Sequence, residues 1–370
     1  MAVLSEEQIM LRNMGVEWAR DRASVTVLRQ LYDGESVGQN PDIYAEMASM
    51  GWTGILIPES HGGSDFGALS LGLLLEQLGR TLLPSALWSS ALVAATALKA
   101  GTEAQQARWL PGIADGSVIA ALATPHGGFP VPNTPSITAS IESDGWRLSG
   151  RVGPVPDGML AHLFILSAET EKGTTLFLLP ADSPGLSRRA LAQIDARAPA
   201  ILELDGVAIE AQGLLAGPEN AAQILEHVLD CARVGLAAEM LGSATQAFET
   251  TLEYLKVRVQ FDRLIGSFQA LQHRAACMFQ ELELLRSAVE SALAAIDAQD
   301  ADLPAKASAA KALAGEILNA ISNEMVQMHG GIGMTHEHDA GLYLKRARVA
   351  DQLLGNAAYH RERWGRLRGF

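Results

Sequence analysis

The last third of the sequence holds residues whose types and spacing suit the binding of an anion. Arg258 is permanently charged, and its guanidinium can hold a diphosphate by paired hydrogen bonds. Gln269 follows eleven residues later, and Gln327 precedes the pair Gly330 and Gly331. A glycine pair lets the backbone approach a ligand closely, because no Cβ intervenes. Each feature also has a plainer interpretation: a solvated base at a helix end for Arg258, and a helix stop for the glycines.

The histidines and cysteines give weaker indications of a functional site. His336 and His338 lie two residues apart and His329 lies seven before His336. Zinc sites need a third or fourth ligand at defined spacing, so we expect no metal. Cys231 and Cys277 both fall on helical stripes, where we expect buried, inert thiols. Two cysteines exclude a disulfide framework and favour a reducing, cytoplasmic location.

Composition narrows the class of protein further. The chain has 370 residues, of which 48% are hydrophobic and 19% charged, enough apolar material for a large core. The formal net charge is -14, which argues against nucleic-acid binding, since that function favours a basic surface. We find no secretory signal and no apolar stretch of about 18 residues, so we expect no membrane span.

Three sequence patterns follow one another along the chain. Residues 1–116 show helical spacing of leucines. Residues 117–217 hold clustered prolines and short apolar runs, which are typical of a β-barrel or sandwich. Residues 218–370 return to long apolar stripes, which predict an antiparallel four-helix bundle. The expected fold is therefore α+β, with an N-terminal helical domain, a middle β domain and a C-terminal helical bundle at these boundaries.

This order, together with local motifs, resembles the acyl-CoA dehydrogenase family over nearly the whole chain. The motifs are each weak alone but occur in the family's order and spacing. They are Gly51-Trp52, Ile57-Pro58-Glu59, Gly62-Gly63, Arg258-Val259-Gln260-Phe261, Gly266-Ser267-Phe268-Gln269 and the segment from Gln327 to Gly333.

The resemblance implies an FAD enzyme that introduces an α,β double bond into an acyl-CoA thioester and passes electrons to an electron-transfer flavoprotein or a similar acceptor. A glutamate removes the α proton, and flavin N5 takes the β hydride. Two subunits build each FAD site: one supplies the flavin pocket, and its neighbour supplies contacts to the pyrophosphate and adenosine. The residues that match the neighbour's contribution are Arg258, Phe261, Gln269, Gln327, Gly330 and Gly331.

The residues that match the flavin pocket depart from the family pattern. Ala123 stands where the family has a hydroxyl, and Phe129 stands in place of a serine. Pro154 replaces an aromatic wall, and Pro156 replaces a second hydroxyl. Alanine cannot donate a hydrogen bond, and proline also lacks a backbone donor, so a flavin seated here would lose several contacts.

The catalytic base is missing at both positions that the family uses. Leu354, before Gly355, and Ala232, before Arg233, replace the glutamate, and neither can accept a proton. Glu239 and Asp351 are weak substitute candidates. Glu239 lies about 10 Å along a helix from Ala232, which is far for the same substrate carbon. The plainer interpretation is a polar partner of a neighbouring helix for Glu239, and an ion pair with Arg348 or Lys345 for Asp351.

The departures from the family pattern all fall in the half of the site that holds the flavin and the base. Substitutions accumulated at random would fall in both halves. Some bacterial acyl-CoA dehydrogenases that act on steroid side chains are heterotetramers in which one chain supplies the flavin pocket and base. We expect this chain to be the other kind of subunit, with a second acyl-CoA dehydrogenase-like chain as its partner. Two alternatives stay open: an active homotetramer with an unusual base, and a catalytically silent scaffold or regulator.

Overall fold

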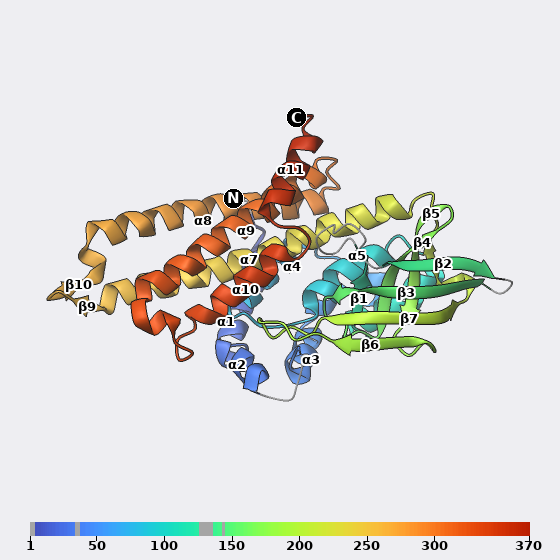
Figure 1. Ribbon diagram of the computed structural model, residues 1–370, viewed down its shortest axis with the longest axis horizontal. Helices are drawn as coiled ribbons and strands as arrows, with labels where there is room; N and C mark the ends of the chain where they lie inside the picture. The colour runs from blue at the N-terminus through green and yellow to red at the C-terminus, as the bar shows by residue number, and fades with distance from the viewer. Residues whose placement is uncertain (1–3, 34–37, 126–135, 143–144) are drawn as a thin grey trace. The chain divides into compact units, whose positions relative to one another are not determined.

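The computed structural model describes residues 4–33, 38–125, 136–142 and 145–370 (Figure 1). Helices come first, a mixed sheet follows and helices return, which confirms the expected α+β fold class. By compactness the chain divides into two units. Unit 1 draws on residues 4–28, 72–83 and 233–370, and unit 2 on residues 29–71 and 84–232. The three domain boundaries expected from the sequence stay predictions.

The first segment of the chain is helical, as its leucine spacing predicts. Ser5 and Thr102 start their helices with capping boxes, in which side chain and backbone satisfy each other's hydrogen bonds. The helices are α1 (Glu6–Arg22), α2 (Val25–Asp33), α3 (Pro41–Ser49), α4 (Ala68–Arg80), α5 (Ala95–Leu98) and α6 (Glu103–Ala114), with the short 3-10 turns η1 (Trp52–Gly54) and η2 (Glu59–His61) and the π-helix η3 (Leu87–Ala94).

The described residues of the middle segment form one mixed sheet in unit 2. Its strands are β1 (Ala120–Ala123), β2 (Ile137–Glu142), β3 (Gly145–Val155), β4 (Leu163–Thr170), β5 (Gly173–Pro180), β6 (Leu186–Ala190), β7 (Ala200–Ile209) and β8 (Leu214–Ala216). The order is β6-β7-β3-β2-β4-β5-β8, and β1 pairs with β4 in parallel. Phe164, Leu166, Phe177 and Leu202 are fully buried in its core, where alternate strand residues point inward.

The last segment is helical again. It contains α7 (Ala221–Val257), α8 (Gln269–Asp297), α9 (Leu303–His329), α10 (Ala340–Gln352) and α11 (Ala357–Leu367), with η5 (Ala211–Gly213) before it and β9 (Val259–Gln260), β10 (Arg263–Leu264), η6 (Ile265–Ser267) and η7 (Gly330–Met334) between the helices. The predicted stripe residues Leu241, Leu285 and Ile321 are buried. Cys231 is buried as expected, but Cys277 is exposed, which corrects its prediction.

Glycines let α4 and α7 approach closely within unit 1. A Cβ added at Gly242 would lie 1.8 Å from the carbonyl oxygen of Glu76, and one added at Gly79 would lie 2.0 Å from that of Glu239. The hydroxyl of Ser243 donates to the carbonyl oxygen of Gly79 across this contact, at 2.8 Å. The two backbones can therefore lie side by side only because both side chains are absent.

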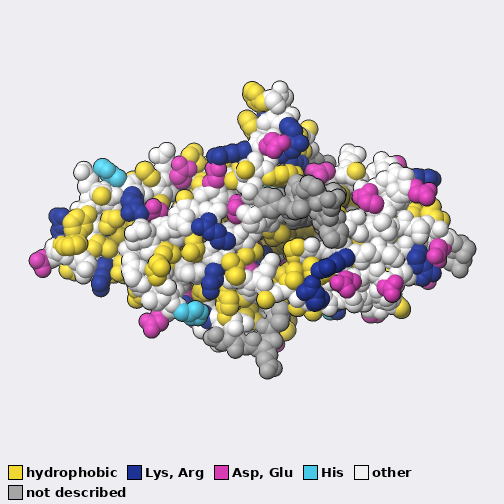
Figure 2. Space-filling view, viewed as in Figure 1, with side chains coloured by type: hydrophobic (Ala, Val, Ile, Leu, Met, Phe, Trp, Pro, Cys, Tyr) yellow, Lys and Arg dark blue, Asp and Glu magenta, His cyan; other side chains and the backbone are white. Residues whose placement is uncertain are grey.

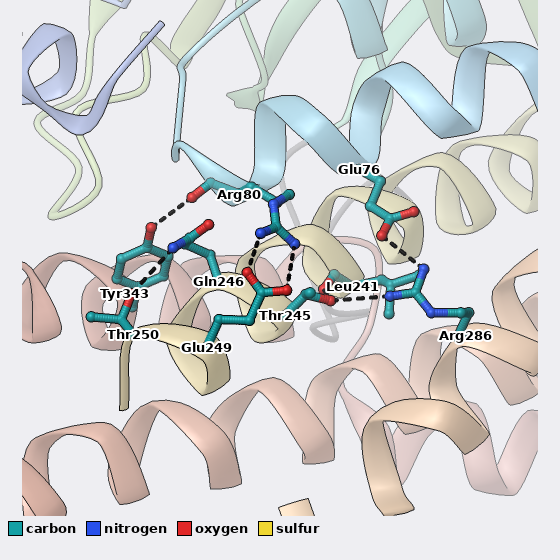
Figure 3. A network of polar contacts seen from close by, with 9 residues as sticks. All are labelled: Glu76, Arg80, Leu241, Thr245, Gln246, Glu249, Thr250, Arg286 and Tyr343. Atoms are coloured by element: carbon teal, nitrogen blue, oxygen red, sulfur yellow. Dashed lines mark hydrogen bonds and ion pairs between the residues drawn. The ribbon is translucent and has the colours of Figure 1, made fainter. Parts of the chain in front are cut away.

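A polar network joins α4, α7, α8 and α10 in unit 1 (Figure 3). Arg80 pairs with Glu249, and its carbonyl oxygen accepts from the hydroxyl of Tyr343 at 2.6 Å. Arg286 of α8 pairs with Glu76 of α4 at 2.8 Å. These contacts fix the relative placement of four helices, of which α7 and α8 flank the connection that carries Arg258 and Phe261. None of the helices in the described ranges is both long and apolar enough to span a membrane.

Candidate functional site

Three of the residues predicted to contact a cofactor lie on the connection between α7 and α8. Arg258 directly follows α7, and its carbonyl oxygen accepts from the backbone N–H of Ile265 at 2.8 Å, which closes the connection. Phe261 stands at the turn between β9 and β10, with φ 55° and 85% of its surface exposed. Gln269 begins α8 and is exposed. The three side chains are therefore exposed before, at the turn of and after a short hairpin.

The other predicted residues lie where α9 ends. Gln327 is exposed on the last turn of α9, which ends at His329. Gly330 has φ 66°, a conformation that favours glycine. Gly331 has no such requirement, and a Cβ added there would meet nothing within 4 Å. Contacts within the chain thus give no reason for glycine at 331, while close approach by a group from outside the chain would.

Tyr254 and His329 join these two segments, a pairing that the sequence did not reveal. The two rings stack with centroids 4.3 Å apart, and the Tyr254 hydroxyl donates to the carbonyl oxygen of His329 at 3.3 Å. Tyr254 lies one turn before Arg258, whose N–H donates to the Tyr254 carbonyl oxygen at 2.9 Å. His329 directly precedes Gly330. The stack therefore couples the arginine segment to the glycine pair.

Two of the histidines, His329 and His338, lie ring against ring. The two ring centroids are 4.2 Å apart. Nδ1 of His329 donates to the carbonyl oxygen of Met325 at 2.7 Å. Burial lowers the pKa of His329, the hydrogen bond to Met325 opposes this, and the neighbouring His338 lowers the pKa further. No cluster of three potential metal ligands occurs within the described part of the chain.

The surface around Arg258 combines a free cation with apolar side chains. Within the described ranges, the structure gives the Arg258 guanidinium no carboxylate partner, so its charge is available to an anion. Hydrophobic side chains gather at the end of unit 1 where Figure 1 places β9 and β10 (Figure 2). Those most exposed around the two turns are Val257 at 70%, Val259 at 53%, Phe261 at 85% and Met334 at 81%. Exposed apolar groups beside polar ones are typical of a protein interface.

The flavin-pocket positions in unit 2 offer few hydrogen-bonding groups. Ala123 is fully buried at the end of β1. The next residue, Thr124, already accepts a hydrogen bond from the Ser167 hydroxyl at 2.8 Å. Pro154 is exposed and Pro156 is half-buried, and neither has a backbone donor. Phe129 lies outside the described residues. The described part of this half therefore offers a flavin ring few hydrogen-bonding partners.

Both positions of the family's base are buried and aliphatic. Ala232 is 1% exposed, and its carbonyl oxygen accepts from the indole N–H of Trp88 at 2.9 Å. Leu354 is 4% exposed, with φ 62°. Its carbonyl oxygen accepts from His360 Nε2 at 2.9 Å. Neither side chain can take up a proton.

A buried lysine fixes the turn around Leu354. Lys311 Nζ donates to the carbonyl oxygen of Asp351 at 3.0 Å and to that of Gly355 at 2.9 Å. Burial lowers the pKa of Lys311 to about 7, opposed by Asp351 and assisted by Arg233. Burial, with Lys311 and Arg233 nearby, lowers the pKa of His360 to about 3. Sequence reasoning missed both residues, because their role depends on contacts between distant segments.

The substitute base candidates occupy different environments. Glu239 is buried, and its Oε1 lies 2.9 Å from Nη1 of Arg346, which also donates to the Leu82 carbonyl oxygen at 3.0 Å. Such a carboxylate is engaged in holding the helices together, in line with its plainer interpretation. The Asp351 side chain accepts from the Gln352 amide at 3.0 Å. Arg348, one of its two expected partners, donates instead to Asn323 at 3.0 Å and to Asn319. Their roles as bases stay predictions.

Comparison with known proteins identifies the family. The model of the acyl-CoA dehydrogenase N-terminal domain matches residues 5–117, and that of the C-terminal domain matches residues 222–367. The chain therefore belongs to the acyl-CoA dehydrogenase family. This membership supports the predicted FAD cofactor and the predicted oxidoreductase class.

Individual relatives cover the chain almost end to end. The acyl-CoA dehydrogenase IpdE2 of Mycolicibacterium smegmatis is 29% identical over 356 residues, which are 95% of this chain and 96% of that protein. A variant of the Tcur3481–Tcur3483 steroid ACAD is 33% identical with a TM-score of 0.88, over 98% of this chain and 97% of the other. The ChsE4–ChsE5 complex from Mycobacterium tuberculosis is 27% identical with a TM-score of 0.91, over 100% of both chains.

Proposed function

We propose that this chain is the subunit of a heteromeric acyl-CoA dehydrogenase that lends contacts to the phosphates and adenosine of an FAD held by a catalytic partner subunit. The observation that carries the proposal is the contrast between the two halves of the site. Arg258 and Gly331 are open to a group from outside the chain, whereas Ala232 and Leu354 fill both base positions with buried aliphatic side chains. Such a chain can support a flavin site without containing one.

The comparisons support a partner of the same fold. The steroid ACAD and the ChsE4–ChsE5 complex each pair two named chains, and this chain resembles them over its full length. The exposed apolar side chains around Arg258 suit contact with such a partner, because an interface buries apolar side chains together with a few charged anchors. We expect a heterotetramer with one FAD for each unlike pair.

The substrate and acceptor follow from the same resemblance. We propose an acyl-CoA with a lipid or steroid acyl group as the substrate of the complex, and an electron-transfer flavoprotein or similar protein as its acceptor. The cytoplasmic location stays a prediction. The acyl group itself is best identified by assaying the complex against acyl-CoA thioesters of different size.

Co-expression tests the proposed subunit role. The chain is purified alone and together with candidate dehydrogenase-like partners, and FAD per complex and acyl-CoA oxidation are measured. We expect little flavin in the chain alone and one FAD for each unlike pair. Stoichiometric FAD and dehydrogenase activity in the chain alone would overturn the proposal in favour of a homotetramer with a substitute base. Glu239→Gln and Asp351→Asn would then identify that base, since the true base variant should lose turnover and keep FAD.

A charge deletion distinguishes a cofactor role from a scaffold role. Arg258→Ala should weaken FAD retention in the complex by about tenfold or more, because a charge-assisted pair with a phosphate is lost. Arg151→Ala is the matched control, since Arg151 is an exposed arginine on β3. Equal FAD retention in both variants would support the silent scaffold alternative.

A further inference from the structure

A groove in unit 2, lined by none of the predicted site residues, is formed by α6 and the ends of the sheet strands. Its volume is about 750 Å³, within the range of pockets that hold small organic ligands. One wall is the α6 face that carries Arg108 and Trp109. The other walls include Leu178 of β5, Ile209 of β7 and Leu214 of β8. The lining therefore combines apolar side chains and one aromatic ring with polar and charged groups.

The walls of the groove are held in place by hydrogen bonds. Gln105, which is 7% exposed, donates from Nε2 to the carbonyl oxygens of Gln212 and Leu214, both at 2.8 Å. Its Oε1 accepts from the backbone N–H of Thr102 at 2.9 Å. One buried amide therefore ties the start of α6 to the loop between β7 and β8. A pocket built in this way is preformed, so ligand binding does not have to order it.

The charges of the groove define what it can hold. The Arg108 guanidinium carbon lies 4.8 Å from the centroid of the Trp109 ring, and no carboxylate accompanies it within the described ranges. The available cation therefore stands at the edge of an aromatic and apolar wall. Glu210 also lines the groove and accepts a hydrogen bond from the Gln212 amide. Its negative charge disfavours a doubly charged group such as a phosphate ester.

We propose that this groove binds a small organic monocarboxylate with an apolar or aromatic body. Arg108 receives the carboxylate by a charge-assisted hydrogen bond, and the body lies against Trp109, Leu178 and Ile209. A neutral hydrophobic molecule leaves the arginine without a counter-charge, and a dianion meets Glu210. The site belongs to unit 2 alone and does not depend on FAD or on a partner subunit.

Fluorescence titration of the full-length chain tests the site. The probe is 1-pyrenebutyrate, and 1-pyrenebutanol is its uncharged match. We expect saturable binding of one pyrenebutyrate per chain and clearly weaker binding of the alcohol. Arg108→Gln should weaken pyrenebutyrate about tenfold or more, the loss expected for a hydrogen bond to a charged group, and leave the alcohol unchanged. Ala104→Trp, which fills the groove from the exposed face of α6, should abolish binding of both.

Control variants test whether the probe binds in the groove beside Arg108. Arg151→Gln removes an exposed arginine elsewhere in unit 2 and should leave both titrations unchanged. Thermal unfolding of each variant checks that the fold is intact. The proposal is overturned if no saturable binding occurs up to about 1 mM probe, a concentration that marks negligible affinity. It is equally overturned if pyrenebutyrate binds Arg108→Gln or Ala104→Trp as tightly as the natural chain.

Discussion

The Tyr254 ring stacks on His329 at 4.3 Å, and its hydroxyl donates to the His329 carbonyl oxygen. This one pair connects the end of α7 to the end of α9. Arg258 therefore has a defined position relative to Gly330, although 71 residues separate them in the sequence. The two motifs that suggested a cofactor contact are thus parts of a single surface, and their relative position depends on an aromatic contact that neither motif includes.

Removing this contact should loosen the surface. Tyr254→Ala should lower the free energy of unfolding by about 2–3 kcal/mol, because a half-buried aromatic ring is lost. Tyr254→Phe keeps the stack and loses one hydrogen bond, so its cost should be about 1 kcal/mol. Urea unfolding measures both. In the complex, the alanine variant should also release FAD faster than the phenylalanine variant. Equal FAD release by the two variants would contradict the coupling.

Gly331 offers a test that separates stability from cofactor contact. Nothing of the chain lies within 4 Å of an added Cβ, and its φ is not in the left-handed region, so Gly331→Ala should change the free energy of unfolding by less than about 0.5 kcal/mol. In the complex, the methyl group should weaken FAD retention about tenfold, because it intrudes on a close contact.

Gly341 provides the control for that substitution. As at Gly331, nothing lies within 4 Å of a Cβ added at Gly341, but Gly341 belongs to α10 and not to the predicted cofactor segment. Gly341→Ala should leave FAD retention unchanged. If Gly331→Ala behaves like Gly341→Ala, the backbone at 331 does not approach the cofactor.

Local periodicity predicted much of this molecule, and long-range contacts account for the rest. The buried stripe through Met278, Leu282 and Leu285 follows from the helical repeat alone. Cys277 was misplaced because a helix turns by about 100° per residue, so the neighbour of a buried residue leaves the stripe. The contacts of Tyr254 and Lys311 join residues 75 and 44 positions apart, and no local pattern encodes them.

The ion pair between Glu239 and Arg346 predicts that substituting Glu239 lowers the stability of the protein and not its catalytic turnover. Both side chains are buried, and Glu239→Gln removes the negative charge that lies against the Arg346 guanidinium. The free energy of unfolding should fall by about 3–5 kcal/mol. Turnover per folded complex should be preserved, which assays below the unfolding temperature can measure. A variant of natural stability with abolished turnover would instead support Glu239 as the base.

The lowered pKa of Lys311 predicts that the free energy of unfolding changes with pH in the alkaline range. Its pKa is about 7 in the folded chain and near 10.5 when unfolded, so between these values the unfolded chain binds the extra proton. The contribution of Lys311 to stability is therefore full above about pH 10.5, falls as the pH is lowered, and is lost below about pH 7. Urea unfolding between pH 7 and 10 should show this slope, and Lys311→Met should lack it.

The same variant also tests the hydrogen bonds of the lysine. A neutral amine still has two N–H groups, enough for the carbonyl oxygens of Asp351 and Gly355. At pH 10, Lys311→Met should cost about 1–3 kcal/mol, because two buried carbonyl groups lose their donor. The cost should shrink toward pH 7, where the natural chain itself buries a charge. A cost that is constant with pH would show that the lysine does not change its protonation in this range.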